Sequence, residues 1–140
     1  VGSEMCIRDS TRENQMGNAY DVMAQTCPSR RVLHSIGARW TIFVLTALDG
    51  GPMRFVEIKT RIVGITPKVL TETLRAMEYD GLIDRRDLGG RPPHVEYELT
   101  GLGRSLLIPL ATVREWAEEH VPDVLAANAR HDQENAPRRR

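Results

Sequence analysis

Cys27 is a potential nucleophile in this sequence, and the nearby His34 is a potential base. A thiol and an imidazole can perform nucleophilic catalysis when a third group orients the base. Both residues lie in one short segment, however, and no distant histidine, acid or glycine-rich loop completes a site. We therefore expect His34 on the surface of a helix and no enzymatic activity.

Metal and cofactor chemistry are not indicated either. The remaining histidines, His94, His120 and His131, lack the spacing of a metal site. The two cysteines, Cys6 and Cys27, are too few for a disulfide framework and form no Cys-x-x-Cys pair. We expect no bound metal, no catalytic residue and no cofactor.

Nucleic-acid recognition is the chemistry that the remaining polar residues suggest. Basic and hydrogen-bonding side chains contact phosphates and base edges. Two neighbouring segments supply them, as Thr66, Lys68, Thr71, Glu72, Arg75, Arg85, Arg86 and Arg91. The formal net charge of the chain is +0, so any attraction to DNA must be local, and the acidic neighbours Asp84 and Asp87 weaken it. Each of these residues would also suit an ordinary solvated surface.

Four helices are predicted in the first part of the chain, from apolar residues at helical spacing and from proline and glycine at the ends. They cover residues 28–36, 40–48, 56–62 and 68–80. The second is apolar around most of its circumference, so we expect it at the centre of the core.

The fourth helix is the best defined of these predictions. Thr66 is a good N-cap and Pro67 suits the first helical position. Leu70, Leu74 and Met77 form its inner stripe, which leaves the polar residues named above for its outer face.

A β-hairpin and a last helix follow. Residues 82–87 and 94–99 predict two strands around a loop rich in glycine and proline, which places Arg85 and Arg86 on a strand and Arg91 at the tip. The last helix begins after Thr100 with an expected kink at Pro109. Its apolar stripe is Leu102, Leu106, Leu110, Val113 and Trp116.

This order of elements predicts a winged helix-turn-helix, mainly α-helical with a small antiparallel hairpin as the wing. The domain should cover residues 27–120. Residues 1–10 have the sequence that a transposon sequencing adapter encodes in frame, and we expect them to contribute nothing to the fold. Residues 11–26 should form a tail or an extra helix, and residues 121–140 a mostly disordered extension.

Six blocks in this order resemble the HxlR family of bacterial transcriptional regulators, a MarR-like group. They cover roughly two thirds of the chain and read CP (27–28), IGARWT (36–41), RFVEI (54–58), ITPKVL (65–70), LRAMEYDGLI (74–83) and VEYELT (95–100). The resemblance implies a homodimer built by the first and last helices. It also implies that residues 66–80 form the recognition helix for double-stranded DNA and residues 82–99 the wing, with repression as the expected outcome.

Cys27 has a further meaning in this family, because relatives use a cysteine at the matching place to sense quinones, aldehydes or oxidants. A helix dipole starting at Pro28, with Arg30 and Arg31 close by, would favour the reactive thiolate. The alternative is a small buried residue that packs at the dimer contact, which is how free cysteines most often behave. The sequence therefore leaves open whether a small molecule or an oxidant acts as an effector.

The role of the last helix and the nature of the partner also stay open. The apolar stripe of that helix would either complete the core of one chain or pair with a second copy, and its length favours pairing. A winged helix also serves in some proteins as a protein-interaction module without DNA. The sequence has no apolar run of the roughly 18 residues that cross a bilayer and no leading signal segment, so we expect a cytoplasmic protein without membrane contact.

Overall fold

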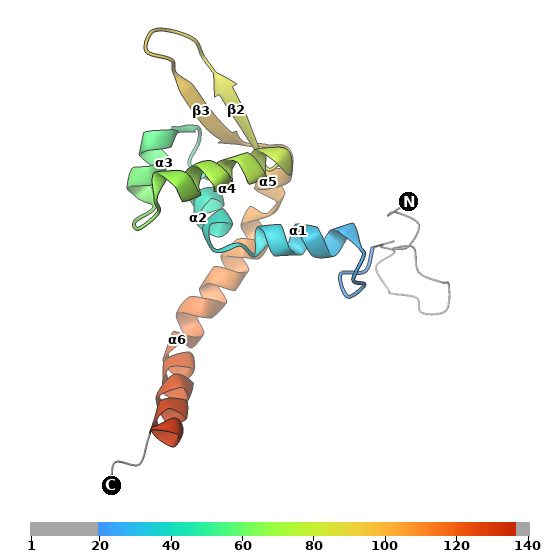
Figure 1. Ribbon diagram of the computed structural model, residues 1–140, viewed down its shortest axis with the longest axis vertical. Helices are drawn as coiled ribbons and strands as arrows, with labels where there is room; N and C mark the ends of the chain where they lie inside the picture. The colour runs from blue at the N-terminus through green and yellow to red at the C-terminus, as the bar shows by residue number, and fades with distance from the viewer. Residues whose placement is uncertain (1–19, 137–140) are drawn as a thin grey trace. The chain divides into compact units, whose positions relative to one another are not determined.

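The computed structural model describes residues 20–136 of the chain. The chain divides into two units, residues 1–105 and residues 106–140. The first unit contains five helices and a small sheet among its described residues, and the second contains one helix (Figure 1). The adapter prediction for residues 1–10, the tail prediction up to residue 19 and the last four residues lie outside the described part.

The four predicted helices are confirmed. They are α1 (Pro28–Ile36), α2 (Arg39–Leu48), α3 (Phe55–Arg61) and α4 (Pro67–Tyr79). Pro28 and Pro67 each occupy the first turn of a helix, where the missing N–H costs no hydrogen bond. The prolines and glycines at the helix ends therefore predicted the bounds of these helices to within one or two residues.

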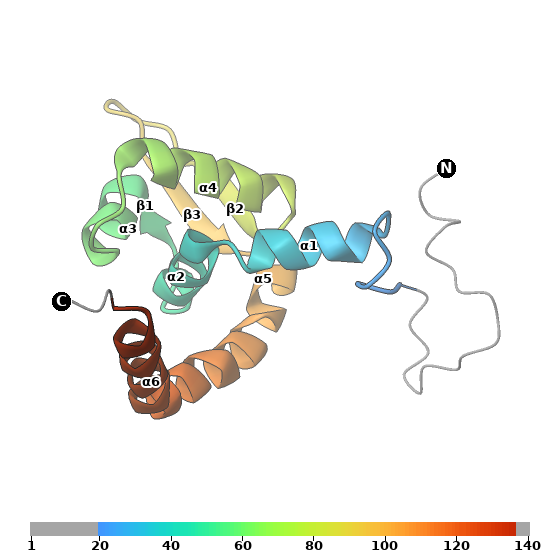
Figure 2. The ribbon, with the colours of Figure 1, turned by 60° about the horizontal axis from the view of Figure 1, so that its bottom comes forward.

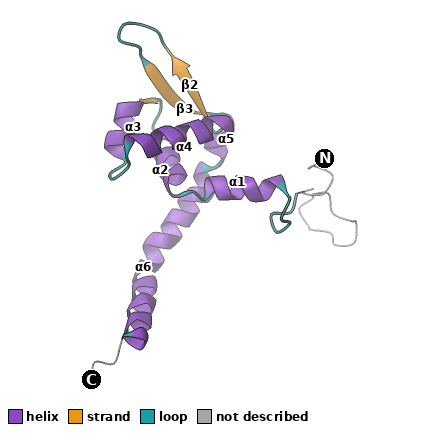
Figure 3. Ribbon diagram, in the orientation of Figure 1, coloured by secondary structure: helices purple, strands orange, loops and turns teal. Residues whose placement is uncertain are grey.

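The sheet has one strand more than predicted (Figure 3). The hairpin consists of β2 (Ile83–Asp87) and β3 (Val95–Leu99), paired antiparallel with Ile83 opposite Leu99. The additional strand, β1 (Met53–Arg54), pairs with the other edge of β3 and gives the order β1-β3-β2. The prediction of a two-stranded sheet is therefore corrected to three strands. Strand β1 was missed because two residues are too few to show an alternating pattern.

The core of the first unit lies between α2, α3, α4 and the sheet. The predicted stripe of α4, Leu70, Leu74 and Met77, is buried. These side chains pack in a core with Val44, Leu45, Leu48, Ile58, Ile83 and Leu99. Helix α2 lies in this core as expected, but its apolar residue Phe43 is 50% exposed, so the helix also has a solvent face.

A close backbone approach joins the base of the hairpin to the end of α4. The Thr100 hydroxyl donates to the Gly81 carbonyl at 2.6 Å and accepts from the Gly103 N–H at 3.1 Å. A side chain at Gly103 would place its Cβ 2.1 Å from the Leu82 carbonyl oxygen. Glycine is required there, because the short helix α5 (Gly101–Ser105) lies directly against backbone.

The last helix differs from the prediction in two ways. The helix is interrupted at Leu106, and α6 (Leu107–Asn135) begins after it, so Pro109 lies in the first turn of α6. The helix also continues through most of the expected disordered extension, since residues such as Ala, Leu, Arg and Glu favour helix there. None of its residues is buried. No helix in the described part of the chain is long and apolar enough to cross a bilayer.

Candidate nucleic-acid interface

A helix-turn-helix is formed by α3, a short turn and α4 (Figure 2). Gly64 has a φ of 89° in the turn, a conformation that favours glycine. The Thr66 hydroxyl then accepts a hydrogen bond from the Val69 N–H at 3.2 Å, which confirms Thr66 as the N-cap. These local features fix where α4 begins and which face it turns to solvent.

The outer face of α4 carries four exposed residues in a row: Lys68, Glu72, Arg75 and Tyr79. We name this row the α4 stripe. Its later members are four, seven and eleven positions after the first, which places them on one side of the helix, opposite the buried leucines. Three of them were predicted. Tyr79, with 84% of its surface exposed, was missed, although its distance of four residues from Arg75 was the available signal.

Thr71 lies beside this stripe and is half-buried. Its hydroxyl donates to the Pro67 carbonyl at 2.8 Å. The hydroxyl proton is thus used within the helix, and the oxygen lone pairs and the methyl group remain for an outside partner.

The wing carries its three predicted arginines in solvent, but they differ in their partners. Arg86 forms an ion pair with Glu98 on the neighbouring strand at 2.5 Å. Arg85 lies opposite Tyr97 in the register of the hairpin. Arg91 lies in the loop, where the Asp87 carboxylate accepts from the Gly89 N–H at 2.9 Å and shapes the turn. Arg86 is therefore the wing arginine whose charge is most fully compensated among the three.

The two elements lie close together at one end and diverge at the other. Strand β2 packs against α4, while the hairpin loop projects beyond the helices (Figure 1). Positive and negative side chains balance over residues 54–99. The surface therefore carries separate positive side chains without a net positive charge. This arrangement suits contacts at defined positions on a double helix better than non-specific electrostatic binding.

Comparison with known proteins decides the family. The family model described as HxlR-like helix-turn-helix matches residues 35–124. The chain belongs to this family. The HTH-type transcriptional regulator YtfH of Escherichia coli K12 is 40% identical over 106 residues, which cover 76% of this chain and 84% of the relative. The family is thus one of transcriptional regulators, in agreement with the sequence-based resemblance.

Solved structures of HxlR-type proteins share the fold. The putative regulator YtfH from Salmonella typhimurium has a TM-score of 0.72 and 38% identity, covering 78% of this chain and 97% of its own. The redox regulator HypR in its reduced form has a TM-score of 0.64 and 35% identity, covering 71% and 98%. The winged-helix fold of this HxlR member is therefore supported by more than its own sequence pattern.

Cys27 occupies the N-cap of α1 in this HxlR member. It is 3% exposed, and its Sγ lies 3.0 Å from the Ser29 Oγ. The predicted position before a helix dipole is thus present, but the solvent access that a sensor thiol needs is small in this conformation.

The residues predicted for a dimer contact are divided between the two units. Leu102 in α5 is 59% exposed. Leu106 and Leu110, around the start of α6, are half-buried, while Val113 and Trp116 further along are exposed. The Trp116 ring stacks on His120 with centroids 4.8 Å apart. His34 lies on the solvent side of α1, and no group of metal-ligating side chains occurs among residues 20–136.

Proposed function

We propose that this chain is a sequence-specific transcriptional repressor that binds double-stranded DNA as a homodimer. The α4 stripe carries the proposal, because it presents charged and aromatic side chains from a helix whose opposite face is anchored in the core. A major groove about 12 Å wide accepts one such helix. The wing then reaches the flanking backbone or minor groove.

The roles on α4 follow from the chemistry of base edges. Arg75 is suited to a bidentate contact with guanine, and the Glu72 carboxylate to a cytosine amino group. Lys68, near the helix N-terminus, is suited to a phosphate. The Thr71 methyl group and hydroxyl oxygen complete the set of side chains that face a base pair.

The first turn of α4 also has a backbone donor for a phosphate. Pro67 has no N–H, and the N–H of Val69 is bound to the Thr66 hydroxyl. The N–H of Leu70 is bound to the Thr66 carbonyl at 2.9 Å. Among the described residues this leaves the N–H of Lys68 without a partner, at the positive end of the helix dipole.

Pairing of two chains is supported by the apolar surface of the helices outside the core. Helix α6 has 29 residues and no buried one, and α1 also has none. Val32 and Leu33 of α1 and Val113 and Trp116 of α6 are about half exposed. Contiguous apolar patches on such helices are typical of interaction sites.

The test uses duplexes enriched from a random pool by the full chain. Arg75→Ala should reduce discrimination among sequences by about tenfold or more, since one bidentate contact is worth about 1–3 kcal/mol. Arg91→Ala should instead weaken all sequences to a similar extent. Two variants that bind like the wild type would show that this surface does not contact DNA.

Salt distinguishes this function from that of a protein-interaction module without DNA. Affinity for DNA should fall steeply as the salt concentration rises, because bound counterions are released. A hydrophobic protein contact should be nearly insensitive. A flat salt dependence of the measured affinity would favour the interaction module.

A thiol response through Cys27 is a second candidate, favoured by its N-cap position and by the similarity to the redox regulator HypR. Diamide, which is reduced to a hydrazine, would join the Cys27 thiol and an added glutathione thiol as a mixed disulfide, and the added bulk at a buried position would disturb the start of α1. Affinity for the enriched duplex should change on addition of diamide and glutathione in the wild type and stay constant in Cys27→Ser. Identical responses would leave Cys27 as a packing residue.

A further inference from the structure

Helix α1 is held to the rest of its unit with little apolar burial. None of its residues is buried, and Val32 and Leu33 are 44% and 54% exposed. The helix extends outward from α2, α3 and α4 (Figure 2). Some further interaction must therefore fix its direction.

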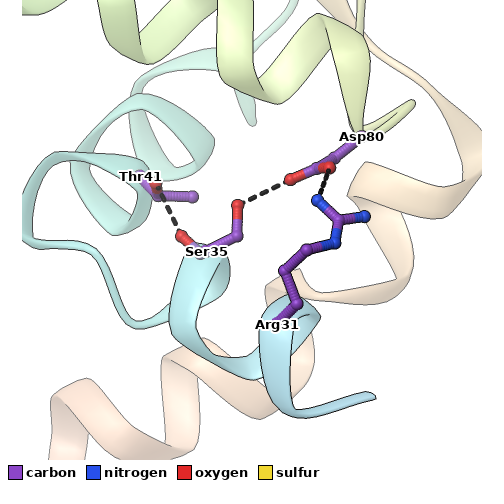
Figure 4. Close-up of polar contacts among 4 residues, drawn as sticks. All are labelled: Arg31, Ser35, Thr41 and Asp80. Atoms are coloured by element: carbon purple, nitrogen blue, oxygen red, sulfur yellow. Dashed lines mark hydrogen bonds and ion pairs between the residues drawn. The ribbon is translucent and has the colours of Figure 1, made fainter. Parts of the chain in front are cut away.

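A polar cluster supplies that interaction (Figure 4). Asp80 is the C-cap of α4, and its side chain is 13% exposed. Its Oδ2 accepts from the Ser35 hydroxyl at 2.6 Å, and its Oδ1 accepts from Arg31 Nη1 at 3.2 Å. Both carboxylate oxygens thus bind α1, through residues 45 and 49 positions away in sequence.

The two contacts are unequal. The Ser35 bond is short and partly buried, as expected for a hydroxyl that donates to an ionised carboxylate. Arg31 is 62% exposed, so solvent screens its attraction. The Ser35 carbonyl also accepts from the Thr41 hydroxyl at 3.1 Å, which ties the same turn to α2. Ser35 is therefore the main partner of Asp80.

The cluster lies in a groove of about 480 Å³ between α1 and α4. Arg31, Ser35 and Asp80 line this groove together with Ala38, Glu72, Ala76 and Tyr79. Among the described residues, the polar contacts between the two helices are those of Asp80, at the C-terminal end of α4. A joint at one end sets the angle between two helices, because an open groove gives little resistance to rotation.

We propose that Asp80 is a positioning residue that fixes α4 against α1 and so sets the separation of the two recognition helices in the dimer. The inference rests on the proposed function, in which α1 belongs to the dimer contact and α4 reads DNA. In this proposal the Asp80 carboxylate links these two parts of the molecule through its contacts with Ser35 and Arg31.

The experiment measures preference for spacing. Two copies of a half-site, taken from duplexes enriched by the wild-type chain, are placed at a series of centre-to-centre distances around 10 bp. The wild type should prefer one distance. Asp80→Ala should reduce that preference by about tenfold, the effect of one hydrogen bond to a charged group, and leave affinity for a single half-site unchanged.

Further variants separate positioning from folding. Ser35→Ala, a smaller change, should flatten the spacing profile in the same way, and Ser35→Thr should restore it. The double variant should add little to Asp80→Ala, because the two residues act through one bond. Asp49→Ala is the matched control, since Asp49 is the exposed C-cap of α2.

Hydrogen exchange of the free chain reports on the same joint without DNA. Amides of α1 should exchange about tenfold faster in Asp80→Ala and Ser35→Ala than in Asp49→Ala. If the wild type enriched no duplex, the proposed function and this inference would both fail. If it enriched duplexes but Asp80→Ala and Ser35→Ala kept the wild-type spacing profile, this inference alone would be overturned.

Discussion

Helices α4 and α6 both expose much of their surface, but they expose different chemistry. Helix α4, with 13 residues, buries three apolar side chains and turns charged residues outward. Helix α6, with 29 residues, buries none. Its exposed residues include Ile108, Val113, Trp116, Val121, Val124 and Leu125. Helix α4 packs its apolar face in the core of its own chain and exposes polar residues that suit a polar partner. Helix α6 exposes apolar residues that suit another protein.

The largest effect is expected where α4 enters the core. Leu74→Ala should lower the free energy of unfolding by about 2–5 kcal/mol, because Leu74 is 2% exposed and its removal leaves a cavity. Urea denaturation at two protein concentrations measures it. The loss should be the same at both concentrations. A loss below about 1 kcal/mol would mean that α4 is not anchored as described.

An intermediate effect is expected on α6. Trp116→Ala should weaken dimerisation by about 30-fold, equivalent to about 2 kcal/mol for a buried aromatic anchor. Sedimentation equilibrium measures the dissociation constant. Arg114→Ala is the control from the same helix, since its ion pair with Glu118, at 3.9 Å, is exposed and contributes little. Equal dimer dissociation constants for the two variants would show that the apolar residues of α6 do not form a protein contact, and α6 would then not differ from α4 in this respect.

The smallest effect concerns the start of α4. Thr66→Ala removes the N-cap hydroxyl and should cost about 1 kcal/mol of stability, which Thr66→Ser should restore. Thr60→Ala is the control, because the Thr60 hydroxyl only bonds the Val56 carbonyl within its own helix. Thermal unfolding compares them. If Thr60→Ala were as destabilising, the capping role of Thr66 would be unsupported.

The sequence predicted elements that local chemistry defines. Prolines at the first turn of α1 and α4, and the spacing of Leu70, Leu74 and Met77, were sufficient for helices and for the buried face. The hairpin followed from its glycine-rich loop. These features depend on neighbours within a few residues, so no knowledge of the fold was needed.

Features that depend on distant partners were missed. Strand β1 exists because β3 offers an edge to Met53 and Arg54. The link between Ser35 and Asp80 joins residues that have no local relation. The interruption of the last helix at Leu106 was also missed, since Pro109 is equally compatible with a kink and with a first turn. The positions of the α4 residues at the candidate interface were predictable, but the compensation of Arg86 by Glu98 was not.

The junction around Thr100 and Gly103 has a consequence for how the wing tolerates change. Two hydrogen bonds hold the base of the hairpin to the turn after α4, from the Thr100 hydroxyl to the Gly81 carbonyl and from the Thr100 N–H to the Leu82 carbonyl. Gly103 adds a close backbone contact, while the loop at residues 88–94 is exposed at its tip. Extra residues placed between Gly89 and Gly90 should lengthen the hairpin without shifting the helix beside it. The length of the proposed DNA-contacting wing is thus open to engineering at the tip, with the base left intact.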